Sequence, residues 1–494
     1  MMGRLRGAFD SPHWRLITGV TSGVSGWIAV SVIGAFATHE IALRYGANGY
    51  SIFVAALAFG SVVENFTDLG LFQVLQRDIA RDVSSAPHLM GLVVGLRLTL
   101  SAIVVPISVV VAFAVYRHHP LSLRIAIVLV LLSLPLASAQ QVVLAYYSAT
   151  NRLSTTAVIG VIKQITFVVL VVLFITFHLS VVYCVGASQV GSVVATVISV
   201  AAIRREIRLR FVVDVHEWGR MLAETTSVGL SSIIGILYLN ADILLLSVLA
   251  TSKQLGYYGV AYAVISVFQV FPALLSRAIL TRIVQTVEEK LSTVVNKVIV
   301  YYAISGALIG SLSIVCGSSV IQLYAGSHFG NAVVPLQILS VGQIFLFISG
   351  GLSNISIARG HHRKLFQSGL IGVLLNVALN LIFIPHYGIR GSAVATTLCE
   401  VILSFVMVRI VRRDLKIVVH IVRASWRAIL AALAPCLILW HWYGHGTESV
   451  LTGFILILPT ALIFFAVLAF IQGIPSDLVS LLRSVFQVRK GEVS

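Results

Sequence analysis

The chain has 494 residues, of which 58% are hydrophobic and only 11% are charged, and its formal net charge is +16. Soluble domains carry roughly 25% charged residues, so this composition excludes an ordinary soluble enzyme, a disordered chain and a small disulfide-held domain. The four cysteines, Cys184, Cys316, Cys399 and Cys436, lie in apolar stretches without CxxC spacing and are interpreted as small core residues. The composition indicates a polytopic membrane protein.

Fourteen apolar runs are long enough to cross a bilayer as helices, because a spanning helix needs about 20 residues. In chain order they are 16–38, 49–72, 91–115, 124–148, 155–177, 180–203, 222–249, 256–276, 298–324, 333–357, 365–385, 390–411, 424–443 and 449–471. The apolar part of the first run, Ile17–Ala37, is longer than the core of a secretory signal peptide. We therefore expect it to remain as the first transmembrane helix.

Lys and Arg residues indicate the orientation, because they accumulate in cytoplasmic loops. With the N-terminus in the cytoplasm, most of the 34 Lys and Arg residues fall on the cytoplasmic side. Five fall outside: Arg44, Arg117, Arg124, Lys253 and Arg390. A missed or invented helix would reverse all later loops, so the span count and the orientation support each other. We predict a multi-pass protein of the cytoplasmic (inner) membrane with both termini cytoplasmic. Since the positive charge then serves orientation, nucleic acid is excluded as a partner.

A faint internal repeat relates the two halves. Gly49-Tyr50-Ser51 opens the second run and Gly256-Tyr257-Tyr258 opens the eighth. Six spans separate these positions, and an even number gives both halves the same orientation, as in a parallel repeat. We predict an N-terminal lobe at 1–203, a basic cytoplasmic linker at 204–221, a C-terminal lobe at 222–416, two further helices at 417–472 and a cytoplasmic tail at 473–494.

The sequence contains no motif for catalysis. It has no P-loop, no HExxH and no GxSxG. The pairs His118-His119 and His361-His362 lie in short loops without nearby carboxylates or cysteines, and we interpret them as solvated loop residues. We expect no enzymatic activity, no cofactor and no metal centre.

Two acidic residues lie within spans of the second half, where burying a charge in the bilayer is costly. Glu400 is about 15 Å from either end of its predicted helix and cannot reach water by extending its side chain. It either serves a proton or substrate path or forms a structural ion pair. Asp242 lies nearer the outer side, where it is either functional or solvated in a vestibule. Asn240, two residues away, does not share its helix face.

Four charged residues in the first half form a second group. Glu64 and Asp68 are four residues apart and therefore share a helix face. Arg97 and Lys163 lie at similar depths in the cytoplasmic halves of their spans. One interpretation is an internal set of salt bridges, and the other is a pair of surplus cations that face a cavity built to accept an anion. Further candidates for the lining of this cavity, which could instead form interhelical hydrogen bonds, are Gln140, Gln141, Asn376 and Asn380.

Three segments resemble the polysaccharide (O-antigen) flippases of the multidrug/oligosaccharidyl-lipid/polysaccharide exporter superfamily. They are Tyr45 to Arg81, with Asp68-Leu69-Gly70-Leu71 and Arg77-Asp78-Ile79-Ala80; Asp242 followed by Gly256-Tyr257-Tyr258 and Ala261; and Ile384 to Thr397 followed by Glu400. The order and spacing of these segments are similar to the family across nearly the whole chain. Asp68, Arg77, Asp242 and Glu400 match recurrent family positions.

The resemblance implies an all-α membrane protein with two six-helix lobes around a central cavity and two additional C-terminal helices. It implies that a polyprenyl-diphosphate-linked oligosaccharide moves from the inner to the outer leaflet by alternating access. Cavities in this family are often cationic, which Arg97 and Lys163 fit. Glu64, Asp68, Asp242 and Glu400 are the candidates for coupling to an ion.

Two alternatives stay open at this point. A cation-coupled multidrug exporter of the same superfamily would need an acidic pocket, and a membrane polysaccharide polymerase would need a large outer loop or a catalytic acid pair. The expected partners of the flippase are the lipid-linked oligosaccharide, membrane lipids and H⁺ or Na⁺ as coupling ion. A polysaccharide polymerase and a chain-length regulator are candidate protein partners.

Overall fold

The computed structural model describes residues 12–207, 212–269, 271–272, 275–276, 283, 286, 288–416, 421–443 and 450–473. These residues form helices and short connections, without a β-strand. The chain divides into two compact units, Met1–Gly256 and Tyr257–Ser494. Each is described by itself below, as the first unit and the second unit.

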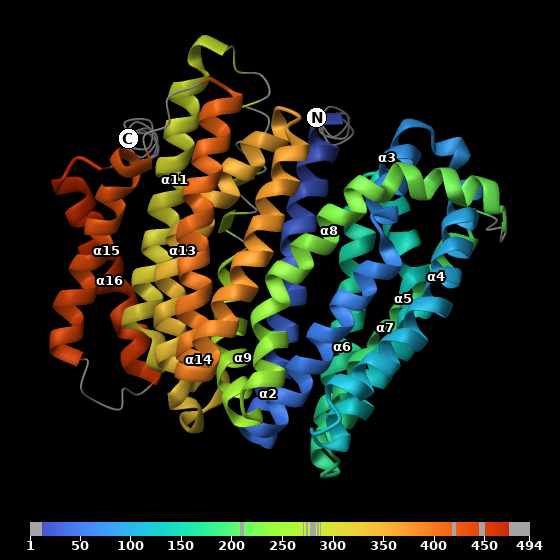
Figure 1. Cartoon of the computed structure of the whole chain (residues 1–494), viewed down its shortest axis with the longest axis horizontal. Helices are drawn as coiled ribbons and strands as arrows, with labels where there is room; N and C mark the ends of the chain where they lie inside the picture. The colour runs from blue at the N-terminus through green and yellow to red at the C-terminus, as the bar shows by residue number, and fades with distance from the viewer. Residues whose placement is uncertain are drawn as a thin grey trace, which may run out of the picture. The chain divides into compact units, whose positions relative to one another are not determined.

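The described part of the first unit consists of helices, most of them long (Figure 1). They are α2 (Pro12–Asp68), α3 (Leu71–Arg81), α4 (Ala86–Val115), α5 (Leu121–Ala149), α6 (Leu153–Thr176), α7 (Val181–Arg204) and α8 (Val215–Leu249), with the short 3-10 helix η1 (Val83–Ser85) before α4. Helix α9 (Ser252–Phe268) begins at the end of this unit. The described part of the second unit continues with α11 (Glu288–Val315), α12 (Gly317–Ala325), η2 (Ser327–Ala332), α13 (Val333–Ala358), α14 (His362–Asp414), α15 (Ile421–Tyr443) and α16 (Val450–Phe470).

Helix α2 is two helical segments that meet at Gly46, where φ is +61° and ψ is −168°, a conformation open to glycine. A Cβ added at Gly34 would collide with Gln164 of α6, and Phe53 stacks on Phe167 of the same helix. In a straight helix Phe53 would lie about 28 Å beyond Gly34. The residues that they contact on α6, Phe167 and Gln164, are less than one helical turn apart. The chain therefore reverses at Gly46 and crosses twice, as the runs 16–38 and 49–72 predict.

Helix α14 is a second such hairpin, with its bend at Gly388, where φ is +57°. The Cys399 thiol donates to the carbonyl of Gly372 at 3.4 Å. These two residues would lie about 40 Å apart in a straight helix. The bend therefore separates two antiparallel helices, in agreement with the predicted runs 365–385 and 390–411.

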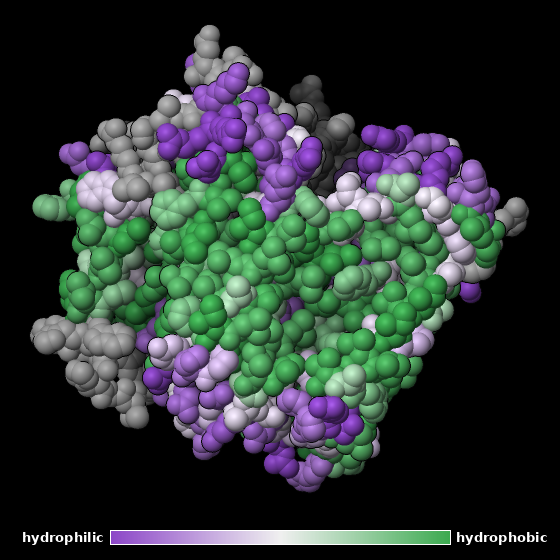
Figure 2. Space-filling view, viewed as in Figure 1, coloured by the Kyte–Doolittle hydropathy of each residue, from purple (hydrophilic) through white to green (hydrophobic). Residues whose placement is uncertain are grey.

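The helices have the length and surface of membrane spans. Ten of the described helices are long and apolar enough to cross a bilayer, with each hairpin counted once. Figure 2 shows hydrophobic side chains over the middle of the helices and hydrophilic ones at their ends. Large apolar side chains point outward along these helices: Val110, Leu132, Val169, Leu374 and Leu458 are all more than half exposed. The protein is an all-α, polytopic membrane protein, as predicted, while the total of fourteen spans stays a prediction.

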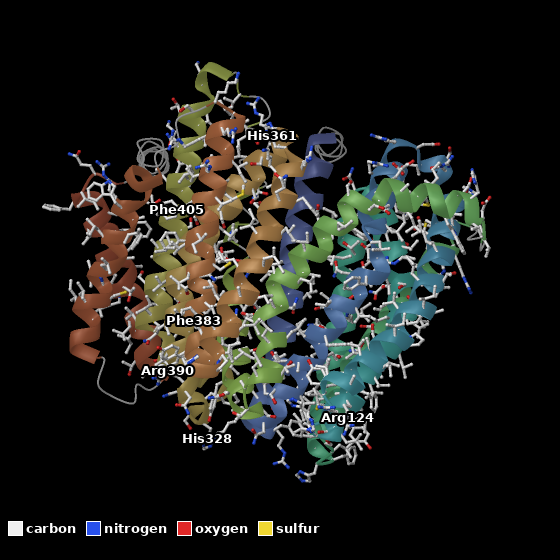
Figure 3. The ribbon with its side chains drawn as sticks, in the orientation of Figure 1. Arg124, His328, His361, Phe383, Arg390 and Phe405 are labelled. Atoms are coloured by element: carbon white, nitrogen blue, oxygen red, sulfur yellow. The ribbon has the colours of Figure 1, made fainter. Side chains whose placement is uncertain are left out.

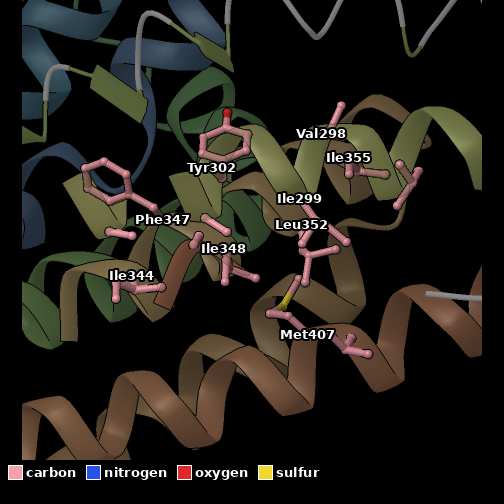
Figure 4. Packing of buried hydrophobic residues seen from close by; sticks show 14 of the residues in the cluster. Val298, Ile299, Tyr302, Ile344, Phe347, Ile348, Leu352, Ile355 and Met407 are labelled. Atoms are coloured by element: carbon pink, nitrogen blue, oxygen red, sulfur yellow. The ribbon is translucent and has the colours of Figure 1, made fainter. Parts of the chain in front are cut away.

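The second unit is held together by an apolar core between α11, α13 and α14 (Figure 4). Its buried side chains include Val298, Ile299, Tyr302, Ile344, Phe347, Ile348, Leu352, Ile355 and Met407. Within this unit His361 lies at one end of the bundle, and His328 and Arg390 lie at the other (Figure 3). The predicted topology also places residues 361 and 390 on opposite sides of the membrane. Which side is cytoplasmic stays a prediction.

Helix α8 begins at Val215, seven residues before the predicted run. Asp214 caps it, because its carboxylate accepts hydrogen bonds from the backbone N–H groups of His216 (2.9 Å) and Glu217 (3.0 Å). The Trp218 indole N–H then donates to the Leu92 carbonyl of α4 at 3.1 Å. The start of α8 is thereby packed within the first unit. The predicted lobe boundaries stay a prediction, and part of the predicted linker and the tail from 474 lie outside the described residues.

Candidate functional site

The predicted charged group of the first unit is assembled from three helices. The second half of α2 supplies Glu64 and Asp68, α4 supplies Arg97, and α6 supplies Lys163. Arg97 is only 1% exposed, and one of its terminal nitrogens lies 3.3 Å from Asp68 Oδ1. This distance defines a buried ion pair between α2 and α4.

Arg97 keeps unused hydrogen-bonding capacity. Its Nε and Nη1 groups have no hydrogen-bond partner, and neither does the hydroxyl of Ser101, which is fully buried one turn further along α4. Buried polar groups are nearly always paired, so such exceptions require an explanation. The shared face of Arg97 and Ser101 has free donors for an acceptor that the protein itself does not supply.

Lys163 differs from Arg97 in its partners. It is half-buried, and in the described part of the chain no carboxylate lies within 4.0 Å of its ammonium group. The charge of Glu64 acts on both Lys163 and Arg97. The side-chain amide of Gln141 on α5 donates to Glu64 Oε1 at 3.4 Å, whereas its neighbour Gln140 is buried and forms no bond to the four charges.

The structure thus brings Glu64, Asp68, Arg97 and Lys163 into one group with two acids and two bases. The salt-bridge interpretation holds for Arg97 and Asp68. Lys163 and the Nε and Nη1 nitrogens of Arg97 are still available to bind an anion, as the second interpretation requires. The anion-binding interpretation stays a prediction.

Asp68 also belongs to the turn that joins α2 to α3. Leu69 and Gly70 both have positive φ, at +46° and +79°. The Asp68 carboxylate accepts from the backbone N–H of Gly70 and from that of Phe72, each at 3.2 Å. A left-handed conformation costs roughly 1 kcal/mol or more at a residue such as Leu69, and these bonds offset that cost.

The same turn rests on the backbone of α8. A Cβ added at Gly70 would lie 2.7 Å from the amide nitrogen of Gly229, and one added at Gly229 would collide with the Leu69 carbonyl. Both glycines are therefore required for the close approach of the two segments, and no side chain separates the turn from α8.

We predict that Gly229→Ala lowers the thermal stability of the purified protein. The added methyl group must displace the turn or the helix, which costs typically about 1–3 kcal/mol. Gly219→Ala is the matched control on the same helix, because a Cβ there has open space, and alanine favours a helix by up to about 1 kcal/mol. Thermal unfolding in detergent measures both variants. Equal melting temperatures for the two would contradict the close contact.

Charged side chains join α3 and α4 to the first turns of α8. Arg77 lies 2.7 Å from Asp78 and 3.6 Å from Glu224 of α8, and hydrogen bonding to Asp78 raises the pKa of Arg77. His88 on α4 contacts Glu217 of α8 at 2.9 Å. The backbone N–H groups that Asp214 accepts from hold the pKa of its carboxyl below the usual range. These contacts fix the start of α8 to α3 and α4.

In the second unit, the predicted Asn376 and Asn380 form a buried hydrogen-bonded group. The Asn380 side chain donates to the backbone and side-chain oxygens of Asn376, at 2.9 and 3.0 Å. Ser392 donates to Asn380 Oδ1 at 2.7 Å across the hairpin of α14. Asn380 therefore joins the two halves of the hairpin, as an interhelical hydrogen bond would, and Asn376 is bonded to it within one half. That either asparagine also lines a cavity stays a prediction.

The two remaining acids are both buried. Glu400 is 5% exposed, and the Ser349 hydroxyl of α13 donates to it at 3.5 Å. Asp242 is 2% exposed and accepts from the backbone N–H of Ile243, while Asn240 donates to the Ile236 carbonyl of its own helix. Within the described residues, no group of three or more His, Cys, Asp and Glu side chains is placed to hold a metal ion.

Sequence reasoning missed Ser101 and the buried pair of Tyr116 and Ser247, whose hydroxyls lie 2.8 Å apart between α4 and α8. The spacing of four residues from Arg97 was a signal that could have found Ser101. Nothing local in the sequence could have paired Tyr116 with Ser247.

Comparisons with known proteins agree with this architecture. The sequence model of a family described as "Polysaccharide biosynthesis protein" matches residues 42–286. The probable low-salt glycan biosynthesis flippase Agl15 of Haloferax volcanii is 22% identical over 72% of this chain and 75% of its own length. The probable flippase AglR of the same organism is 27% identical over 34% of this chain and 37% of its own length. The capsular polysaccharide biosynthesis protein CapF of Staphylococcus aureus is 21% identical over 39% of this chain and 50% of its own length.

Solved structures show the same fold. The lipid II flippase MurJ in an inward closed conformation aligns with a TM-score of 0.76 at 13% identity, covering 92% of this chain and 99% of that chain. A MOP superfamily transporter from Pyrococcus furiosus aligns with a TM-score of 0.57 at 15% identity, covering 81% of this chain and 95% of that chain. The chain therefore has the fold of these polytopic membrane transporters. Residues 42–286 are thus similar in sequence to the polysaccharide biosynthesis protein family.

Proposed function

We propose that the protein is a flippase that moves a polyprenyl-diphosphate-linked oligosaccharide from the inner to the outer leaflet of the cytoplasmic membrane. The product would serve surface polysaccharide synthesis. The family and the relatives named as flippases support this class of function. The observation that carries the substrate assignment is the buried Arg97, which has two nitrogens, Nε and Nη1, without a hydrogen-bond partner and lies in one group with Lys163.

The oligosaccharide is the part of the substrate that requires a protein to cross the membrane. Each hydroxyl that enters hydrocarbon without a hydrogen-bond partner costs several kcal/mol, so an oligosaccharide does not cross the bilayer unaided. A polar path removes that cost while the polyprenyl chain stays in lipid. Guanidinium and ammonium groups bind phosphate oxygens with charge-assisted hydrogen bonds. Arg97, Lys163 and Gln140 are the first-unit candidates for the diphosphate and sugar, and Asn376 and Asn380 are those of the second unit.

Transport proceeds in this proposal by alternating access and without covalent chemistry on the sugar. The drive is an H⁺ or Na⁺ gradient or the consumption of the product by later enzymes. A buried carboxylate that binds a cation or proton in one state and releases it in another would couple a gradient to transport. The candidates are Glu64, Asp68, Asp242 and Glu400. Both termini lie in the cytoplasm, and a polysaccharide polymerase and a chain-length regulator are candidate partners.

The test is depletion of the protein in its host, followed by extraction of lipid-linked oligosaccharides from each leaflet. We expect complete repeat units to accumulate on the inner leaflet while surface polymer disappears. The wild-type gene and Arg81→Gln, which changes an exposed residue of α3, should restore the polymer. Single units that reach the outer leaflet normally during depletion would contradict the proposal and favour a polymerase or a drug exporter.

A further inference from the structure

We propose that Asp68 is a positioning residue that couples occupancy of the Arg97 site to helix α8 through the α2–α3 turn. This inference rests on the proposed function, because it takes the Arg97 group as the site for a diphosphate. It goes beyond that function by naming the contact through which binding changes the conformation of the protein.

The carboxylate of Asp68 binds two parts of the protein at once, the Arg97 guanidinium and the backbone of the turn. Asp68 Oδ1 contacts the Arg97 guanidinium at 3.3 Å and accepts from the Phe72 N–H at 3.2 Å, while Oδ2 accepts from the Gly70 N–H at 3.2 Å. The carboxylate that holds the buried cation is therefore also the one that stabilises the turn. A change in the position of the guanidinium changes the bonds that Asp68 can offer to the turn.

In the second step an anion binds to the unpaired groups of Arg97. The Nε and Nη1 nitrogens of Arg97 have no acceptor, and the hydroxyl of Ser101, one helical turn away, is also unpaired. A diphosphate that binds there brings two phosphates with about one negative charge each, whereas Asp68 has a single carboxylate, so the diphosphate competes with Asp68 for the guanidinium. Because Arg97 is 1% exposed, the group is poorly screened by water, and this competition is strong.

In the third step a movement of the α2–α3 turn is passed to α8. The turn has two residues in left-handed conformation and lies against α8 with only backbone and two glycines between them. Because these backbone contacts are close-packed, the turn cannot move far unless α8 moves with it. Asp68, the turn and Gly229 thus form a short mechanical path from the anion site to α8.

The protein contains a native reporter of this path. Trp218 of α8 packs in the same apolar cluster as Leu71 and Leu75, the residues of α3 that follow the turn. Its indole N–H is bonded to Leu92 of α4. A movement of α8 relative to the turn would change the surroundings of Trp218 and therefore its fluorescence.

The experiment uses full-length protein in which the other five tryptophans, Trp14, Trp27, Trp426, Trp440 and Trp442, are replaced by Phe. Farnesyl diphosphate and inorganic pyrophosphate are the probes, and binding and Trp218 emission are measured separately. In the otherwise unchanged protein we expect binding and a shift in emission. A response to farnesyl diphosphate alone would identify the lipid-borne group as the ligand, and a response to both would show that the diphosphate suffices.

Asp68→Asn removes the competing charge. We expect this variant to bind the probe at least as tightly as the parent protein, with an emission change smaller by about tenfold. Asp68→Glu is the conservative second variant, since it keeps the charge for Arg97 but moves the carboxylate away from the turn amides. It should bind with parent affinity and also lose the emission change. Glu206→Gln, which removes an acid that pairs with Arg152 and contacts neither α3 nor α8 through that pair, is the control and should keep the full response.

The outcomes separate the two proposals. A full emission response in Asp68→Asn or Asp68→Glu would overturn the coupling and leave the proposed function standing, as would binding to the parent protein without any emission change. Unchanged binding in Arg97→Gln would remove the anion site, and the proposed substrate and the coupling would fall together.

Discussion

Arg97→Gln should reduce translocation of the lipid-linked oligosaccharide by at least about tenfold while the protein still folds and inserts. A hydrogen bond to a charged group contributes about 1.5–3 kcal/mol, and 1.4 kcal/mol corresponds to about a factor of ten. Glutamine keeps one amide donor for Asp68 but removes the positive charge. The measurement is transport in proteoliposomes, with the amount of folded protein checked by size-exclusion chromatography.

A charge-balanced double variant distinguishes the two roles of Arg97. If its role is only to neutralise Asp68, then Arg97→Gln with Asp68→Asn removes both charges and restores transport. If Arg97 binds the diphosphate, the double variant stays as inactive as Arg97→Gln. We expect the second result. Arg81→Gln is the control for loss of an arginine in the same unit, since Arg81 is exposed on α3, and it should transport normally.

Glu400→Gln should abolish the response of transport to an imposed ion gradient, with a loss of at least about tenfold in driven uptake. The carboxylate is 5% exposed, and burying a charge within a membrane span costs several kcal/mol. Glutamine has nearly the same shape and keeps an oxygen for the Ser349 hydroxyl. Folding should therefore persist, and exchange without a gradient should continue.

The measurement for Glu400 compares H⁺ and Na⁺ gradients across proteoliposomes. Asp414→Asn, at the last residue of the same helix, is the matched control and should keep the gradient response. Full gradient-driven uptake by Glu400→Gln would remove this residue from the coupling assignment. Loss of folded protein would instead indicate that Glu400 is a structural group.

The sequence predicted the elements well because the membrane imposes a simple pattern. Hydrophobic runs of the right length mark spans, and the hairpin bends at Gly46 and Gly388 fall where the predicted runs are interrupted. Helix periodicity predicted that Glu64 and Asp68 share one face. The depths of Arg97 and Lys163 in their own spans predicted that these two bases lie near the acids. This part of the site follows from local spacing alone.

The rest of the site depends on contacts that local spacing does not encode. The left-handed turn at Leu69 and Gly70 and its backbone contact with Gly229 connect residues about 160 positions apart. The Ser392–Asn380 bond requires the register of a hairpin. Ser101 becomes informative only when its lack of a partner is visible. Such features depend on the way helices dock, which periodicity does not specify.

The most direct test of the flippase assignment is translocation by the purified protein. Proteoliposomes would carry a fluorescent lipid-linked oligosaccharide, and its appearance in the opposite leaflet would be followed by quenching from outside. We predict protein-dependent translocation of this lipid that falls at least about tenfold in Arg97→Gln. Lipid movement equal to that of empty liposomes, together with protein-dependent transport of organic cations, would contradict the account.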